Sequence, residues 1–315
     1  MLRRAGTYPS PRYVDPMDTR LVSLIRHEDR AKGKSVNILG APYDGGTLGR
    51  KGAAEGPSAV RQSLSGFSNY DIETGESLLD AKVVDLGDVV CGDGDITVVH
   101  SRLEKEIRGA LRNDSMLVTI GGDNSVSLPA LRAFGSKFGK IGLVVVDSHL
   151  DLRGKIGGKP TSGSSYGLAM ETVPGLDPKR VVEVGVHGFL NSGKYHEKAE
   201  RLGVTLYTAE DVRRKGAARV AREAFSVAND GADAVYFSVD FDAIDLSFVS
   251  GVSAPSVGGI TANDLVKIAR YVARREKALA SDIVELAPGL DPTGRSSIVA
   301  ATCLVGMVAG FMSRR

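Results

Sequence analysis

The sequence is poor in cysteine and has no surplus of charge of either sign. Cys91 and Cys303 are the only cysteines among 315 residues, too few for a disulfide framework or a zinc site built from thiolates. Lys and Arg number 40 against 38 Asp and Glu, so the formal net charge is only +2. A chain with so even a balance lacks the basic surface that binds nucleic acid, and we expect no nucleic-acid partner.

Long hydrophobic runs are also missing. The first residues, MLRRAGTYPSPRY, are basic but lead into prolines without the apolar stretch that a secretory signal requires. The most apolar late segment, 303 to 312, is far shorter than the ~20 residues that span a bilayer, so it predicts a buried helix. We therefore expect a cytoplasmic protein that has no membrane partner and whose mature chain begins near Met1.

Short β-branched segments alternate with longer segments of helical spacing along the chain. SVNILGAP (35 to 42), IGLVVV (141 to 146) and AVYFSV (234 to 239) have the continuous apolar character of buried strands. Segments such as AARVAREAFSVAND and TANDLVKIARYVARREKA show helical spacing. This alternation predicts an α/β fold whose parallel sheet is covered by helices on both faces. Since no linker or internal repeat interrupts it, and 42% of the residues are hydrophobic, we expect one compact domain.

A glycine-rich loop between Asp44 and Gly56 follows one of these strands and leads into a helix that should start near Pro57. Such a loop could cradle phosphate, but it has neither the GxGxxG pattern nor the GK[ST] ending of phosphate-binding loops. We expect it to be structural or to lie on the substrate side of the site.

Acidic side chains follow two of the predicted strands, where ligands bind in an open parallel sheet. IGLVVV is followed by Asp147, His149 and Asp151, and AVYFSV by Asp240, Asp242 and Asp245. So many carboxylates would repel one another unless a cation neutralised them. One Asp-x-Asp pair is commonly solvated loop charge, but two such clusters behind buried strands predict a divalent metal site.

The ligand types indicate which metal. Carboxylate oxygens outnumber nitrogen donors, which favours a hard ion such as Mn²⁺ over Zn²⁺ or Cu²⁺. If aspartates are shared, two Mn²⁺ ions could lie ~3.5–4 Å apart and hold a hydroxide between them, because a metal lowers the pKa of the water that it binds. That hydroxide is the expected nucleophile.

Three segments carry a resemblance to a known family. DSHLD (147 to 151), SVDFDAID (238 to 245) and GGDNS (121 to 125) resemble the signature segments of the arginase, agmatinase and formimidoylglutamase family. APYDGGTLGRKGAAEGPSAVR and DIVELAPGLDPTGRSS resemble further family segments in the same order, so the resemblance covers almost the whole chain. It implies a three-layer αβα arginase-like fold with a central, mainly parallel sheet. It also implies a single ureohydrolase domain over 1–315, with 1–34 as an N-terminal extension, assembled as a homo-oligomer, a trimer or hexamer.

The resemblance also implies site residues. By position, the metal ligands are Asp147, His149, Asp151, Asp240 and Asp242, with Asp147 and Asp240 bridging two ions. Two residues depart from the family pattern. Asn124 stands where the motif has a histidine ligand, so we expect the first metal position to be the weaker one. Tyr166, in TSGSSYG, stands where arginases and agmatinases carry a histidine, so the usual proton shuttle is missing.

The substrate branch follows from the second departure. HLDLR followed by SGSSY resembles the formimidoylglutamase branch, including archaeal-type sequences, and indicates substrate binding by Arg153, Ser162 and Tyr166. Arg153 could grip a substrate carboxylate bidentately, or else pair with a nearby acid.

Catalytic roles are predicted for Asp151, Glu285 and His187. Glu285 ends a buried strand where the family's acidic residue holds the cationic amidine, although a capping or ion-paired carboxylate is the alternative. His187 ends another strand and could face the substrate or be a structural histidine.

The expected reaction is hydrolysis of N-formimino-L-glutamate to L-glutamate and formamide by a metal-bound hydroxide. An agmatinase or related guanidino hydrolase that releases urea is the second possibility within the enzymes. Asn124 and Tyr166 also leave open a catalytically silent member of the family that acts as a binding or scaffold protein.

Overall fold

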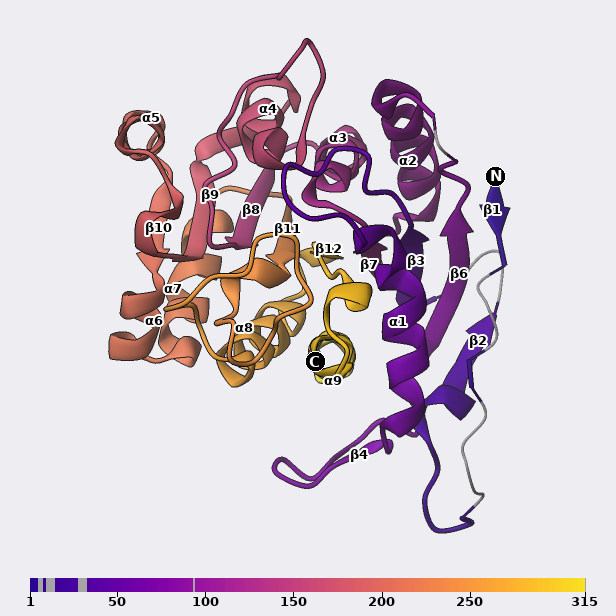
Figure 1. The fold of residues 1–315 in the computed structure, drawn as a ribbon. Helices are drawn as coiled ribbons and strands as arrows, with labels where there is room; N and C mark the ends of the chain where they lie inside the picture. Colours follow the sequence, from indigo (N-terminus) through magenta and orange to yellow (C-terminus); the bar gives the residue numbers. More distant parts are fainter. Residues whose placement is uncertain (5–7, 10–14, 28–32, 93, 315) are drawn as a thin grey trace.

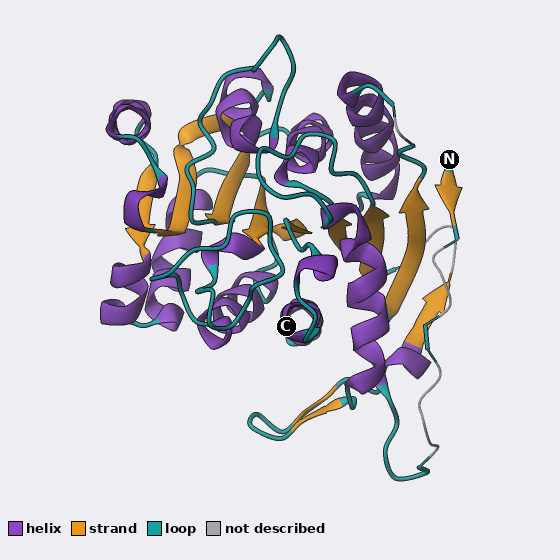
Figure 2. Ribbon diagram, viewed as in Figure 1, coloured by secondary structure: helices purple, strands orange, loops and turns teal. Residues whose placement is uncertain are grey.

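A computed structural model of the chain describes residues 1–4, 8–9, 15–27, 33–92 and 94–314. Within these residues one large sheet crosses the molecule with helices on both sides (Figures 1 and 2). Its strands follow the order β1-β6-β3-β7-β12-β11-β8-β9-β10, with β2 also paired to β6. The strands are β1 (Leu2–Arg3), β2 (Ile25–His27), β3 (Val36–Ala41), β6 (Val83–Val89), β7 (Met116–Gly121), β8 (Ile141–Val146), β9 (Leu176–Val186), β10 (Thr205–Thr208), β11 (Ala234–Asp240) and β12 (Ala278–Val284).

Every described pair of neighbouring strands in this sheet is parallel except β1 with β6. β1 and β2 lie in the predicted N-terminal extension, and both add to the sheet beside β6. The first residues of the chain therefore form part of the sheet instead of a separate tail.

Two groups of helices cover the sheet, which explains why its strands are apolar on both faces. One face is covered by α2 (Ile96–Ala110), α3 (Ser127–Phe138), α4 (Ser165–Thr172) and α5 (Gly193–Leu202); the other is covered by α1 (Gly56–Ser63), α6 (Ala209–Lys215), α7 (Ala217–Ala228), α8 (Ala262–Ala273) and α9 (Arg295–Met312). Along β8, Leu143 and Val145 join the first core, whereas Val144 and Val146 join the second. The predicted three-layer αβα fold with a mainly parallel sheet is confirmed.

The helix α9 is long and apolar enough to cross a membrane by length and composition alone. It starts at Arg295, well before the apolar segment 303 to 312, and 67% of it is buried inside the protein. It packs against α8 and α1. Gly310 permits the close contact with α8, because a Cβ there would lie 2.3 Å from the Arg270 carbonyl oxygen. The prediction of a buried helix is confirmed, although the helix is longer than the apolar segment.

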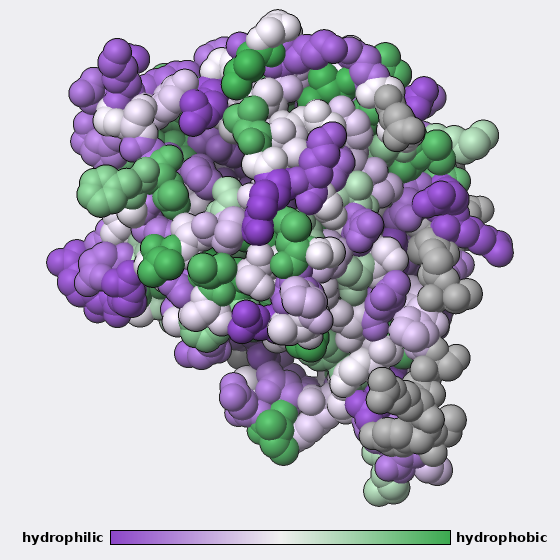
Figure 3. Space-filling model, in the orientation of Figure 1, coloured by the Kyte–Doolittle hydropathy of each residue, from purple (hydrophilic) through white to green (hydrophobic). Residues whose placement is uncertain are grey.

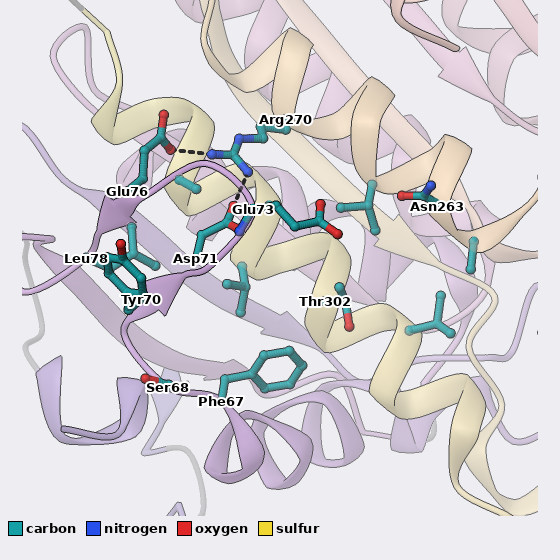
Figure 4. A pocket seen from close by; sticks show the side chains of 16 residues that line it. Phe67, Ser68, Tyr70, Asp71, Glu73, Glu76, Leu78, Asn263, Arg270 and Thr302 are labelled. Atoms are coloured by element: carbon teal, nitrogen blue, oxygen red, sulfur yellow. Dashed lines mark hydrogen bonds and ion pairs between the residues drawn. The ribbon is translucent and has the colours of Figure 1, made fainter. Parts of the chain in front are cut away.

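A short hairpin, β4 (Tyr70–Asp71) with β5 (Glu76–Ser77), projects beside α8 and α9. Arg270 of α8 forms ion pairs with Asp71 and Glu76 and so fixes the hairpin over a hollow of about 490 Å³ (Figure 4). On the face of the molecule shown in Figure 3, hydrophobic residues form small separate groups. The hollow under the hairpin shares no lining residue with the acidic pocket described next.

Candidate metal centre

Four adjacent strands end at the candidate site. β7, β12, β11 and β8 are consecutive neighbours in the sheet and run parallel, so their carboxyl ends meet at one edge. Asn124 follows β7, Glu285 follows β12, Asp240 ends β11, and Asp147 follows β8. The parallel order of the sheet thus brings together side chains that are far apart in the sequence.

Two sets of potential metal ligands lie at this edge. The first, which we call the histidine set, contains Asp147, His149 and Asp242; the second, the carboxylate set, contains Asp147, Asp151 and Asp240. Within each set the ligand atoms lie within 4.8 Å of one another. Asp147 belongs to both sets, as a bridging ligand would, whereas Asp240 belongs to one.

Asp245, the last acid of the second sequence cluster, belongs to neither set. Its carboxylate accepts hydrogen bonds from the backbone nitrogens of Ser247, at 2.9 Å, and Gly258, at 2.7 Å. It shapes the following loop and is not one of the predicted metal ligands.

The aspartates of the carboxylate set are held in an unfavourable environment. Burial, followed by repulsion from neighbouring carboxylates, raises the pKa of Asp147 and of Asp240 well above the usual range. Burial also raises the pKa of Asp151 to about 7. A divalent cation would offset both the cost of burying these negative charges and their mutual repulsion. All three ligand residues of the set offer oxygen atoms. The residues therefore fit a hard divalent metal.

The histidine set is internally paired. Burial lowers the pKa of His149, but Asp242 and the other acids outweigh it and raise the pKa to about 10. The His149 Nδ1 lies 3.0 Å from Asp242 Oδ2, and Ser148 Oγ donates to Asp242 Oδ1 at 2.7 Å. His149 must lose its proton before it can bind a metal.

Asp151 and Glu285 have backbone conformations that are unusual for residues with a side chain. Their φ angles are +46° and +65°, and within the described ranges no other non-glycine residue has a positive φ. Glu285 is held there by hydrogen bonds: its N–H donates to the Gly122 carbonyl, its Oε1 accepts from Asn124 N at 2.7 Å, and its Oε2 accepts from Ser253 Oγ. Backbone strain of this kind concentrates at functional sites.

The two ligand sets open into a pocket of about 180 Å³. Its lining residues are Leu48, Gly49, His149, Asp151, Arg153, Ser162, Gly163, Asp240, Asp242, Ser253, Ala254 and Glu285. Burial and the Asp123 charge raise the pKa of Glu285 to about 8, so this acid is poised to gain a cationic neighbour.

The glycine-rich loop reaches the pocket, and two polar residues hold it there. Ser162 Oγ accepts from Leu48 N at 3.1 Å, and Asp123 Oδ2 accepts from Gly46 N at 2.7 Å. The loop therefore lies on the pocket side, one of the two expectations for it. Sequence reasoning missed Asp123 and Ser253, although both stand beside recognisable strand-end segments.

Arg153 lies exposed at the pocket rim. Its guanidinium lies 5.5 Å from the centre of the Tyr195 ring. None of the carboxylates that the structure describes lies within ion-pairing distance of it, so the alternative of an ion pair with a nearby acid is not found. Its charge remains available to an anionic group in the pocket.

Two predicted site residues do not face the pocket. Tyr166 is completely buried next to Asn124 near the start of α4 and does not line the pocket, which disfavours its predicted contact with substrate. His187 follows β9, one strand beyond β8, and its ring nitrogens lie 2.7 Å from the Gly185 carbonyl and 2.7 Å from Ser256 Oγ. These contacts fit the alternative of a structural histidine, and the catalytic role of His187 stays a prediction.

Asn124 lies beside the carboxylate set, as expected for its position. Its amide Nδ2 lies 2.6 Å from Asp151 Oδ2 and 3.4 Å from Asp147 Oδ2, and its Oδ1 lies 3.2 Å from the Tyr166 hydroxyl. The nitrogen faces the carboxylates in this arrangement, whereas a metal ligand would present its oxygen.

The αβα sheet and its acidic strand ends define a metal-site hydrolase fold, and comparison with known proteins identifies the family. The model of the arginase family matches residues 34–309, and the chain belongs to this family. It is 33% identical to a formimidoylglutamase of Halobacterium salinarum over 308 residues, which cover 96% of this chain and 97% of the relative.

Solved structures of two relatives are similar to this chain over nearly its full length. The crystal structure of formimidoylglutamase from Bacillus subtilis is similar with a TM-score of 0.91 and 28% identity, covering 99% of this chain and 97% of that one. Trypanosoma cruzi formiminoglutamase with Mn2+2 is similar with a TM-score of 0.86 and 28% identity, covering 95% and 100%. The predicted family and hydrolase class are confirmed.

Proposed function

We propose that this chain hydrolyses N-formimino-L-glutamate to L-glutamate and formamide. The observation that carries the proposal is a pocket lined by members of two ligand sets, which share the buried Asp147, with the exposed Arg153 at its rim. Relatives named formimidoylglutamase, similar over nearly the full length of the chain, support the same substrate.

We propose Mn²⁺ as the metal, held as two ions by Asp147, His149, Asp151, Asp240 and Asp242, with Asn124 as a weaker ligand. The oxygen-rich donor set and the manganese in the Trypanosoma cruzi structure support this choice. When bound, the metal lowers the pKa of coordinated water and so supplies a nucleophile near neutral pH.

The chain's own residues orient the substrate. The formimino group is a cation when protonated, and the buried Glu285 carboxylate can accept hydrogen bonds from its nitrogens. Arg153, which also lines the pocket, can bind a glutamate carboxylate, and Ser162 offers a further polar group on the pocket wall. These contacts would place the formimino carbon over the ligand sets.

The glutamate nitrogen must gain one proton when it leaves as an amine. Water adds to the formimino carbon, the bond from that carbon to the glutamate nitrogen breaks, and this nitrogen takes a proton as the amine leaves. We assign the return of that proton to Asp151, whose carboxylate lines the pocket and can accept a proton from the attacking water and pass it to the leaving nitrogen.

Agmatinase activity remains the second candidate. Agmatine carries an amine in place of the carboxylates, and an amine would require an acid at the rim, where the structure has Arg153. A silent scaffold protein is the third candidate, because Asn124 weakens one ligand set.

We also propose a single ureohydrolase domain over 1–315, and a homo-oligomer, trimer or hexamer, in the cytoplasm. The sheet that joins β1 and β2 to the rest of the fold supports the single domain.

The test is a product assay with Mn²⁺ on formiminoglutamate, agmatine and guanidinobutyrate. We expect formamide from the first substrate and little urea from the others, with activity lost on chelation and in Asp240→Asn. Asp245→Asn is the matched control, because this neighbouring acid lies outside both ligand sets and should keep activity. Efficient urea release from agmatine would transfer the assignment to the guanidino hydrolases, and the absence of any turnover with Mn²⁺ would favour the scaffold.

A further inference from the structure

The side-chain amide of Asn124 can be placed in two ways. Its oxygen and nitrogen occupy nearly the same shape, so only the surrounding hydrogen bonds decide which atom faces the carboxylate set. The two positions of the amide contact Asp151 on one side, at 2.6 Å, and the Tyr166 hydroxyl on the other, at 3.2 Å. The two residues that depart from the family pattern, Asn124 and Tyr166, are thus direct neighbours.

A chain of buried hydroxyl groups continues behind Tyr166. The Tyr166 hydroxyl lies 3.0 Å from Ser238 Oγ, and Ser238 Oγ donates to Asp282 Oδ1 at 2.6 Å. Asp282 also accepts from the Tyr236 hydroxyl at 3.0 Å and from Val239 N at 3.2 Å. Because Asp282 accepts at every one of these contacts, it fixes the direction of the chain.

The hydroxyl protons of Ser238 and Tyr166 bear on the orientation of Asn124. Ser238 has one hydroxyl proton and gives it to Asp282, so it can only accept from Tyr166. Tyr166 also has one proton, which it can give either to Ser238 Oγ, at 3.0 Å, or to Asn124 Oδ1, at 3.2 Å. When the nearer Ser238 receives it, the Tyr166 oxygen accepts from Asn124. In that arrangement the Asn124 amide presents its NH₂ to Tyr166 and its oxygen to the carboxylate set.

That orientation is the one that suits a bound cation. Without one, the Asn124 oxygen would face the oxygen of an ionised Asp151 at the 2.6 Å that now separates the amide nitrogen from it, which is repulsive. With a metal between them, both oxygens become ligands and every proton in the chain has an acceptor. All four members of the chain, from Asn124 to Asp282, are at most 1% exposed, so bulk water is excluded from their contacts.

We infer that Tyr166, backed by Ser238 and Asp282, is a positioning residue that turns the Asn124 oxygen toward the metal and so completes the carboxylate set as a metal position. The inference rests on the metal site of the proposed function. It gives Tyr166 a role that needs no contact with substrate.

The test is Mn²⁺ titration of the full chain, followed by calorimetry and by the metal content after dialysis. Outer partners of metal ligands typically contribute 10- to 100-fold in metal affinity, so Tyr166→Phe should weaken one Mn²⁺ position by roughly this factor and leave the histidine set unchanged. Ser238→Ala, which frees the Tyr166 proton, should produce the same loss.

Tyr236→Phe is the matched control. It removes an equally buried hydroxyl that also donates to Asp282 but does not lead to Asn124, so it should leave Mn²⁺ affinity unchanged. In an Asn124→Ala background, Tyr166→Phe should have no further effect on affinity, since the amide it orients is gone.

Three outcomes would count against the inference or the function beneath it. Equal losses of affinity in Tyr166→Phe and Tyr236→Phe, or a loss that persists in the Asn124→Ala background, would overturn the positioning role while leaving the hydrolase assignment intact. No Mn²⁺ binding by the unaltered chain would overturn the proposed metal site itself, together with this inference.

Discussion

The two ligand sets share Asp147 and the same edge of the sheet, yet they are built differently. In the histidine set, His149 and Asp242 pair with one another, and Ser148 adds a hydrogen bond. In the carboxylate set, Asp147, Asp151 and Asp240 all have raised pKa values, Asp151 has a strained backbone, and a neutral amide stands beside them. The comparison shows that one edge of a sheet can carry a self-compensated metal position and one that depends on the metal for its stability.

The largest expected effect comes from the shared ligand. Asp147→Asn should remove Mn²⁺ from both sets and lower kcat/KM by more than the roughly 100-fold typical of an outer partner. Asp242→Asn and Asp151→Asn should each weaken one position only. Metal content and kcat/KM of the three variants measure this, and equal metal loss in all three would remove the distinction between the sets.

The same substitution should stabilise the protein without metal. Asp147 is buried among like charges, so Asp147→Asn relieves repulsion in the metal-free state. We therefore expect a higher melting temperature than the unaltered chain in a chelator and a lower one with saturating Mn²⁺.

Substrate selection depends on a residue outside both sets. Arg153→Ala should lower kcat/KM for formiminoglutamate by about tenfold to a hundredfold, because charge-assisted contacts contribute on the order of 1.5–3 kcal/mol. An uncharged amidine should be hydrolysed almost as well as before. The measurement is kcat/KM for both substrates in Arg153→Ala and in the unaltered chain. An equal loss of kcat/KM for both would mean that Arg153 supports the structure of the site and does not bind a substrate carboxylate.

The melting temperature should depend on pH differently in the metal-free and in the metal-loaded protein. The pKa values of Asp147, Asp151, Asp240 and His149 are raised in the folded chain, so these groups favour folding below their unfolded pKa values and lose that contribution as pH rises. Melting temperatures in a chelator should fall as pH rises from about 4 toward 7 for the acids. Mn²⁺ displaces these protons, so its affinity should rise over the same range, by about tenfold per pH unit for each proton displaced. Parallel melting curves with and without metal would argue against the ligand sets.

The smallest effect concerns Glu183, a buried acid on β9 whose two oxygens have no hydrogen-bond partner among the residues that the structure describes. Burial raises its pKa well above the usual range, so its contribution to stability falls as pH rises above about 4.5. Glu183→Gln should flatten the decline of stability as pH rises above about 4.5, by up to about 1.4 kcal/mol per pH unit, and should leave Mn²⁺ affinity unchanged. Urea denaturation at several pH values measures the free energy of unfolding of both proteins. The same decline with pH in Glu183→Gln and in the unaltered chain would contradict this role of Glu183.

The strand-end acids could be predicted from the sequence because buried parallel strands present their next residues at one edge. Asp147, Asp240 and Glu285 each lie directly at or after such a strand. Tyr166 and His187 could not be placed in the same way. Whether Tyr166 faces the pocket depends on where α4 begins, and His187 follows a strand whose place in the sheet order is set by long-range pairing. Burial of a polar side chain on the core side of a helix leaves no local pattern.

The most direct test of the two unequal ligand sets is Mn²⁺ binding to the unaltered chain at neutral pH, measured by titration calorimetry after complete removal of metal. We expect two positions of unequal affinity, the weaker one lost in Asp151→Asn and the tighter one lost in Asp242→Asn. Two equally tight positions, or no manganese bound at all, would contradict it.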